Sequence, residues 1–261
     1  MNKMTCQLFF ALLAAFALPL TLHAQDNAAA QANNPLANTT AFNVQGYYIY
    51  DFTDIDDSGS QLLFRYAKPL SWGSTKWLMR ATLPINNFPV GPNLDNRTGP
   101  GDFDVFAAYL VDTGDPAISF GFGPDIVIPT ASPQGLGNEQ YQVGLANVYF
   151  NARSTALQFG YLAIYRTGIG DTNGRDRVNL FVLQPFAFLQ LGGGWYTGTA
   201  PIMSYDFETN NYTIPFGLRI GKVFKSGKTV FNIFAEPQVS VADSGAGLPE
   251  SQIFFGVNMQ Y

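Results

Sequence analysis

Apolar and polar residues alternate along most of this chain, and the last eleven residues, SQIFFGVNMQY, show the pattern most clearly. Every second residue from Ile253 to Tyr261 is apolar, whereas the series from Gln252 to Gln260 is mostly amides and glycine. Because successive side chains of a β-strand point to opposite faces, this period of two predicts a strand with one wholly apolar face. Such a face needs an apolar neighbour, either another layer of protein or lipid.

The same alternation recurs from residue 42 onward and predicts about twelve strands of about ten residues each. About ten residues is the length that a tilted strand needs to cross a bilayer. The clearest stretches are residues 42–52, 61–68, 77–85, 102–111, 157–166 and 230–241. Further candidates are residues 117–129, 143–153, 178–191, 195–205 and 212–224.

The segments between these stretches are alternately short and long, which is typical of the turns and loops of transmembrane barrels. The long polar ones are residues 53–59, 86–101, 130–140, 167–177, 206–211 and 243–250. We therefore predict an all-β fold, a transmembrane antiparallel up-and-down β-barrel of about 12 strands of the bacterial outer-membrane type, with both termini periplasmic. The alternative is a secreted β-sandwich, which needs an outer face richer in Lys, Glu and Asp than these strands provide.

The composition excludes several other classes of protein. Hydrophobic residues make up 47% of the 261 residues and aromatic residues 15%, while charged residues make up only 13%. Soluble domains usually contain about 25% charged residues. The sequence pI near 4.7 argues against nucleic acid as a partner, because nucleic acid binds to a basic face. After the N-terminal region, no run approaches the roughly 20 apolar residues of a membrane helix.

The N-terminus has the features of a secretory signal peptide. Lys3 precedes an apolar run from Leu8 to Leu20, and the small residue Ala24 stands at the predicted cleavage point. The following residues are small and polar, which predicts a flexible segment. We therefore expect a signal peptide at residues 1–24, a flexible periplasmic lead-in at residues 25–41 and the β-barrel at residues 42–261. The expected location is the outer membrane of a Gram-negative cell, in contact with its lipid and lipopolysaccharide.

The C-terminal strand also predicts how the protein is assembled. Lipid would cover its apolar face, and pairing with neighbouring strands would satisfy its edges. The terminal aromatic residue resembles the carboxy-terminal signal that the outer-membrane assembly machinery reads in bacteria. The residues of this signal are Phe255, Val257, Met259 and Tyr261. We therefore expect the assembly machinery to be a partner.

Catalysis is not expected from this sequence. After removal of residues 1–24 the chain contains no His and no Cys, which excludes a Ser-His or Asp-His arrangement. A Ser-Lys or paired-carboxylate site stays open, although the lysines are few and lie mostly at turns. No cofactor is expected. The acidic loop at residues 53–59 lacks the closing Glu of a calcium loop, so no metal site is expected there.

Charged residues on the predicted inward faces are the strongest chemical signal. The cations are Arg65, Arg80, Arg153, Arg166 and Arg219, and the acids are Asp51, Asp104 and Glu236. One interpretation is a charged constriction that filters solutes. The other is a set of ion pairs that fill and rigidify the lumen, which we favour because both signs of charge are present.

Three stretches resemble one family of bacterial outer-membrane transporters. They are residues 33–48 (NNPLANTTAFNVQGYY), 65–84 (RYAKPLSWGSTKWLMRATLP) and 99–110 (GPGDFDVFAAYL). The family is grouped under the MetA pathway of phenol degradation, and some of its members carry the misleading label neuromedin U. The resemblance implies a β-barrel that passes small, often aromatic or apolar, molecules. It supplies no catalytic or binding residue.

The function predicted from these observations is passive passage of small molecules, aromatic or apolar ones among them, across the outer membrane. The alternative is a structural or surface-interaction barrel with a closed lumen. The filling of the lumen separates these two functions. Phe106, Leu162, Ile164 and Phe254 fall on inward faces and predict a narrow, partly apolar interior.

Overall fold

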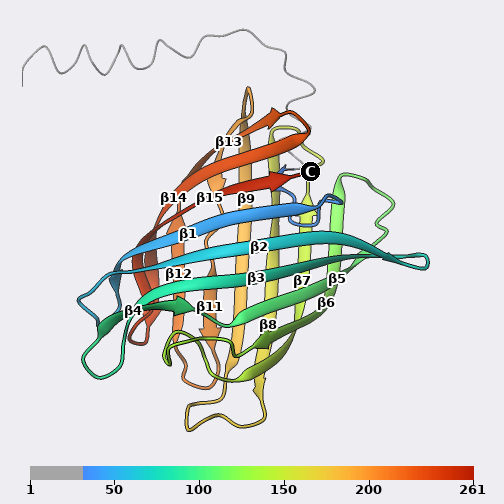
Figure 1. Ribbon diagram of the computed structural model, residues 1–261. Helices are drawn as coiled ribbons and strands as arrows, with labels where there is room; N and C mark the ends of the chain where they lie inside the picture. The colour runs from blue at the N-terminus through green and yellow to red at the C-terminus, as the bar shows by residue number, and fades with distance from the viewer. Residues whose placement is uncertain (1–31) are drawn as a thin grey trace, which may run out of the picture.

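The computed structural model describes residues 32–261, which form a closed β-barrel (Figure 1). The predicted signal peptide and residues 25–31 of the predicted lead-in lie outside the described residues. Within residues 32–261, no helix is long and apolar enough to span a membrane. The strand segments are β1 (Ala41–Phe52), β2 (Gly59–Trp72), β3 (Thr75–Val90), β4 (Asp95–Pro100), β5 (Phe103–Val111), β6 (Ile118–Ile128), β7 (Tyr141–Asn151), β8 (Leu157–Ile169), β9 (Asn179–Gly192), β10 (Trp195–Thr199), β11 (Met203–Asp206), β12 (Tyr212–Gly217), β13 (Arg219–Ser226), β14 (Thr229–Ser244) and β15 (Pro249–Gln260).

These fifteen segments make twelve barrel strands, because three strands are each interrupted once. β4 and β5 both pair with β3, β10 and β11 with β9, and β12 and β13 with β14. Proline explains two interruptions, because it has no backbone N–H to donate to the ladder. Pro201 lies between β10 and β11, and Pro237 of β14 stands opposite Leu218, which separates β12 from β13. The predicted twelve-stranded antiparallel barrel is therefore confirmed.

Pairing between the first and last strands closes the barrel. β1 and β15 are antiparallel, with partners that run from Ala41 and Gln260 at one end to Phe52 and Pro249 at the other. β15 also pairs with β14 on its other side. The C-terminal strand therefore has no free edge, and its backbone groups are hydrogen-bonded within the sheet.

The barrel has two unlike ends, which we call the turn end and the loop end (Figure 1). The turn end, toward the top and right of the view, holds the C-terminus, the start of β1 and short connections such as residues 193–194 and 227–228. The loop end holds the longer connections, among them residues 129–140 and 170–178. The alternation of short and long connections predicted from the sequence is therefore present.

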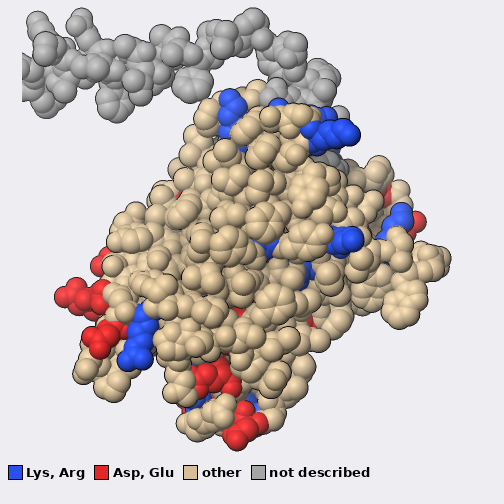
Figure 2. Space-filling model, in the orientation of Figure 1, with Lys and Arg blue, Asp and Glu red and all other residues tan. Residues whose placement is uncertain are grey.

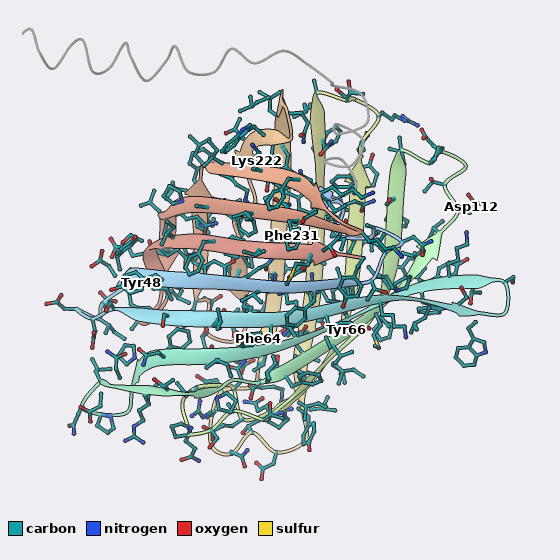
Figure 3. All side chains as sticks on the ribbon, turned by 45° about the horizontal axis from the view of Figure 1, so that its top comes forward. Tyr48, Phe64, Tyr66, Asp112, Lys222 and Phe231 are labelled. Carbon is teal, nitrogen blue, oxygen red and sulfur yellow. The ribbon has the colours of Figure 1, made fainter. Side chains whose placement is uncertain are left out.

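The outer face of the barrel is apolar, as the alternation predicts. Tyr48 and Phe255 are 44% and 43% exposed, whereas Gln45, on the opposite face of β1, is buried. Figure 3 labels outer-face rings of β1 and β2, those of Tyr48, Phe64 and Tyr66. In Figure 2 most charged residues gather near the two ends, and uncharged residues cover most of the wall between them. A belt of this kind suits a hydrocarbon environment.

The end of β1 departs from the predicted alternation. The sequence pattern places Phe52 on the outer face with Tyr50. Phe52 is instead 6% exposed, and its ring centroid lies 6.0 Å from the ring centroid of Phe88. The register between β1 and β15 shifts between Ile49 and Asp51, and again before Phe52. A bulge adds a residue to one strand and so turns the following side chains to the other face. The same shift leaves Asp51 exposed, although the pattern predicts that it faces inward.

Side chains fill much of the interior in two apolar clusters. The first includes Phe186 and Phe254, and the second includes Phe106, Leu162 and Ile164. The sequence pattern places Phe106, Leu162, Ile164 and Phe254 on inward faces, and each of these side chains is no more than 6% exposed. The prediction of a partly apolar interior is therefore confirmed.

Candidate functional site

Residues 32–40 lie inside the turn end and pack against the wall of the lumen. Leu36 is 3% exposed and belongs to the second apolar cluster. The side-chain amide of Asn34 donates to the Ser119 hydroxyl at 3.0 Å. The flexibility that the composition of residues 25–41 predicts stays a prediction. Residues 32–40 rest at the turn end, where the lumen provides an apolar wall for Leu36 and a polar partner for Asn34.

Arg166 of β8 contacts two carboxylates in the lumen. Its guanidinium lies 3.0 Å from Asp104 of β5 and 3.2 Å from Asp125 of β6. Gly144 stands beside Arg166 on the intervening strand β7, where an added Cβ would lie 2.9 Å from the Arg166 Cβ. The absence of a side chain at Gly144 therefore leaves room for the arginine to cross β7.

Asp125 is a lumen residue that the sequence analysis missed. It is 1% exposed and lies in the ion pair with Arg166. The alternation in residues 117–129 does place Asp125 on the strand face opposite Phe122 and Ile126. This residue lies in a glycine-rich strand, however, where the alternation is weak and does not by itself identify which face is inward.

Arg219 of β13 and Glu236 of β14 form a buried ion pair. The Arg219 Nε lies 2.6 Å from the Glu236 carboxylate, which also accepts hydrogen bonds from the Ala200 backbone N–H and the Gln238 amide, each at 3.0 Å. The Arg219 guanidinium lies over the Phe234 ring, 4.0 Å from its centroid. The two charges neutralise each other, in agreement with the ion-pair interpretation of the lumen, while the Nη2 atom of Arg219 is buried without a hydrogen-bond partner.

Arg65 and Arg80 have no acid beside them. Arg65 donates to Gln45 Oε1 at 2.5 Å, and the Arg80 guanidinium lies 4.3 Å from the centroid of the Phe106 ring. The Nε atom of each arginine is buried without a hydrogen-bond partner. In the described part of the chain, no carboxylate oxygen comes within 4.0 Å of either guanidinium. These two arginines are therefore not explained by ion pairs inside the lumen.

Arg153 lies at the turn end and not in the lumen, which corrects its prediction as a lumen residue. β7 ends at Asn151, and the Arg153 side chain is 66% exposed and lies 2.7 Å from Asp115. The Ala117 N–H and, after it, the Arg153 guanidinium hold the pKa of Asp115 below its usual value. The inward assignment fails because the alternation was extended two residues beyond the end of the strand.

Cavities remain between these side chains at both ends of the lumen. The turn-end cavity has a volume of about 140 Å³ and lies between residues 32–39 and the inner wall. Its charged lining residues are Arg65, Arg80 and Arg219. A loop-end cavity of about 340 Å³ lies against residues 135–138. Its lining includes Asp104, Gln142 and Arg166. Four of the five arginines predicted to line the lumen therefore do so.

A closed twelve-stranded antiparallel barrel, apolar outside and charged inside, defines a β-barrel of the bacterial outer-membrane type. No protein-family model matches the sequence, and none of the curated proteins is similar to it in sequence. The membership of a particular family that three stretches of the sequence predict therefore stays a prediction.

Solved structures of outer-membrane barrels share this fold. An outer membrane channel from Pseudomonas putida F1 is similar with a TM-score of 0.64 at 12% identity, over 87% of this chain and 96% of that chain. The NanC porin is similar with a TM-score of 0.52 at 11% identity, over 84% of this chain and 98% of that chain. At these identities the likeness concerns the fold alone.

Proposed function

We propose that this protein is an outer-membrane channel through which small molecules pass passively, without catalysis. The observation that carries this proposal is the interior of the barrel, where charged side chains line cavities at both ends inside a wall with an apolar outer face. Charged residues that line a lumen select the solutes that pass. Residues 32–261 contain no His, so a nucleophile there has no imidazole base to activate it.

The dimensions and lining of the turn-end cavity support small solutes, aromatic or apolar ones among them. Its volume of about 140 Å³ is close to that of an engineered protein cavity, roughly 150 Å³, that holds benzene. The rings of Phe186, Phe188 and Phe254 contribute to its wall. The resemblance of three stretches of the sequence to the phenol-degradation transporters favours the same class of solute.

The proposed location is the outer membrane of a Gram-negative cell, reached after cleavage of a signal peptide near Ala24. The apolar belt supports contact with outer-membrane lipid and lipopolysaccharide. The alternating C-terminal strand, with Phe255, Val257, Met259 and Tyr261 on one face, supports recognition by the assembly machinery.

A structural or surface-interaction barrel with a closed lumen is the competing function. Residues 32–40 and the two apolar clusters occupy much of the interior, and this filling favours a closed lumen. The long connections at the loop end would then bind the partner. A closed lumen gives no route for solutes, so the two functions differ in a measurable way.

Uptake by cells separates these functions. Cells that produce the protein are compared with cells that lack it, for a phenolic solute and for a small inorganic ion. A channel with a partly apolar lumen should increase the uptake of the phenolic solute. Equal uptake of both solutes in the two kinds of cell would contradict the channel and support the structural barrel.

A further inference from the structure

Arg65 and Arg80 carry positive charges in the lumen that no neighbouring carboxylate pairs. The lumen arginines are Arg65, Arg80, Arg166 and Arg219, and its carboxylates are Asp102, Asp104, Asp125 and Glu236. Asp104 and Asp125 lie beside Arg166, and Glu236 lies beside Arg219. The Asp102 carboxylate accepts hydrogen bonds from the Ala131 and Asn138 N–H groups, so the two charges without an adjacent counter-ion are those of Arg65 and Arg80. A charge held away from water without a counter-ion is costly, and an anion from solution would remove that cost.

Arg65 and Arg80 are positioned to share one anion. In the register of β2 and β3, Arg65 stands opposite Thr82 and Arg80 stands opposite Ala67. The two arginines are therefore diagonal neighbours on the same face of the sheet, a spacing that long side chains can bridge. Each retains a buried Nε without a partner, and both line the turn-end cavity.

The other side of the same cavity is aromatic. Phe186 and Phe188 of β9 line it, and their rings stack with centroids 6.0 Å apart and planes 6° apart. β9 is separated from β3 by the strands that contain β5, β6, β7 and β8, so the phenylalanines and the arginines lie on distant parts of the wall. A ligand that fills the cavity would contact cations on one side and rings on the other.

We propose that the turn-end cavity binds a small monocarboxylate that carries an aromatic ring. The carboxylate lies between Arg65 and Arg80, and the ring packs against Phe186 and Phe188. Guanidinium groups bind carboxylates through strong, charge-assisted hydrogen bonds, and one carboxylate would give Arg65 and Arg80 a shared counter-charge. A small inorganic anion between the arginines would make no contact with the rings of Phe186 and Phe188. This inference rests on the proposed function, because it names the solute class of the same lumen.

The binding of three ligands to the purified protein in detergent tests this proposal. Benzoate carries both features, benzyl alcohol keeps the ring without the charge, and acetate keeps the carboxylate without the ring. Isothermal titration calorimetry in a chloride-free buffer should show benzoate binding about tenfold or more tightly than either of the others. If acetate or benzyl alcohol binds as tightly as benzoate, the proposal is overturned.

Substitutions locate the binding site. Arg65→Gln and Arg80→Gln should each weaken benzoate binding about tenfold and leave the binding of benzyl alcohol unchanged. Arg153→Gln is the matched control, because it removes an arginine that is exposed at the turn end. Circular dichroism and heat-modifiable migration verify that each variant is folded. Unchanged benzoate affinity in the folded Arg65 and Arg80 variants overturns the proposal, and if neither folds, the comparison of the three ligands decides it.

Conductance of the same preparations in planar bilayers distinguishes this inference from the proposed function. Benzoate binding without any conductance would retain the anion site and contradict the channel. Conductance without benzoate binding would retain the channel and overturn the anion site. Binding that requires Arg65 and Arg80, together with conductance that benzoate reduces, is the result expected when both are correct.

Discussion

Four arginines point into the lumen, and their surroundings divide them into two kinds. Arg166 and Arg219 are held by carboxylates at 2.6–3.2 Å, so their charges are neutralised within the wall. Arg65 and Arg80 instead contact an amide oxygen and an aromatic ring, respectively. The sequence shows that these residues face inward, but it does not show which of them are paired. Pairing depends on side chains from strands that are distant in sequence.

The Arg219–Glu236 pair is predicted to be important for stability. Glu236 is 0% exposed, and its replacement by glutamine would leave the buried Arg219 guanidinium without its counter-charge. We expect Glu236→Gln to lower the free energy of unfolding by about 3–5 kcal/mol. Urea unfolding of the protein in lipid vesicles measures this. Arg153→Gln, which breaks an exposed pair, should change little, and an equal effect of the two substitutions would contradict the prediction.

Among the strand segments, the sequence predicts faces better than boundaries. Alternation places Tyr48, Gln45 and Phe254 on their observed faces, because one side of each strand meets an apolar environment throughout. It predicts a strand over residues 61–68, where β2 extends over Gly59–Trp72. The difference arises because a strand that continues beyond the apolar belt no longer needs alternation. The bulge before Phe52 is not visible in the pattern either, because it depends on pairing with β15.

The segment of residues 32–40 shows a second limit of the sequence. Its composition is that of a flexible chain, yet Leu36 and Asn34 find partners inside the barrel. Burial of this segment depends on space that only the closed barrel creates. Composition alone cannot reveal such space, whereas the inward positions of the barrel arginines follow from local alternation.

Leu36 is predicted to anchor this segment in the lumen. Leu36→Asp places a charge in an apolar cluster, so residues 32–40 should leave the wall while the barrel, closed by β1 and β15, stays folded. The conductance in planar bilayers should then increase relative to the wild type. Leu94→Asp, in an exposed connection, is the control. An unchanged conductance in the folded Leu36 variant would show that the segment does not obstruct the lumen.

The last strand is predicted to matter for assembly more than for the folded state. Tyr261 is 59% exposed and its backbone N–H donates to the Thr40 carbonyl at 3.0 Å, while the ladder between β1 and β15 ends at Gln260. Deletion of Tyr261 should reduce the folded protein recovered from cell outer membranes but preserve refolding in detergent. Tyr261→Phe, which keeps the aromatic ring, should behave as the wild type. Equal recovery after the deletion would exclude a role of this residue as an assembly signal.

For the barrel as a whole, a closed wall surrounds a narrow interior. The wall suits a membrane for two reasons: its outer face carries aromatic residues, and β15 has no free edge. The interior is divided between apolar clusters, ion pairs and cavities of about 140 and 340 Å³. We therefore expect passage of small molecules and not the wide aqueous pore of a large porin, which is built from more strands.

Single-channel recording of the wild-type protein in planar bilayers tests the proposed channel most directly. A narrow charged lumen predicts discrete, small conductance steps, and their size should change when Arg65 or Arg80 is replaced by glutamine. Arg153→Gln should leave the steps unchanged, because that side chain lies outside the lumen. A folded protein that inserts into the bilayer and shows no conductance steps would contradict the channel and favour the barrel with a closed lumen.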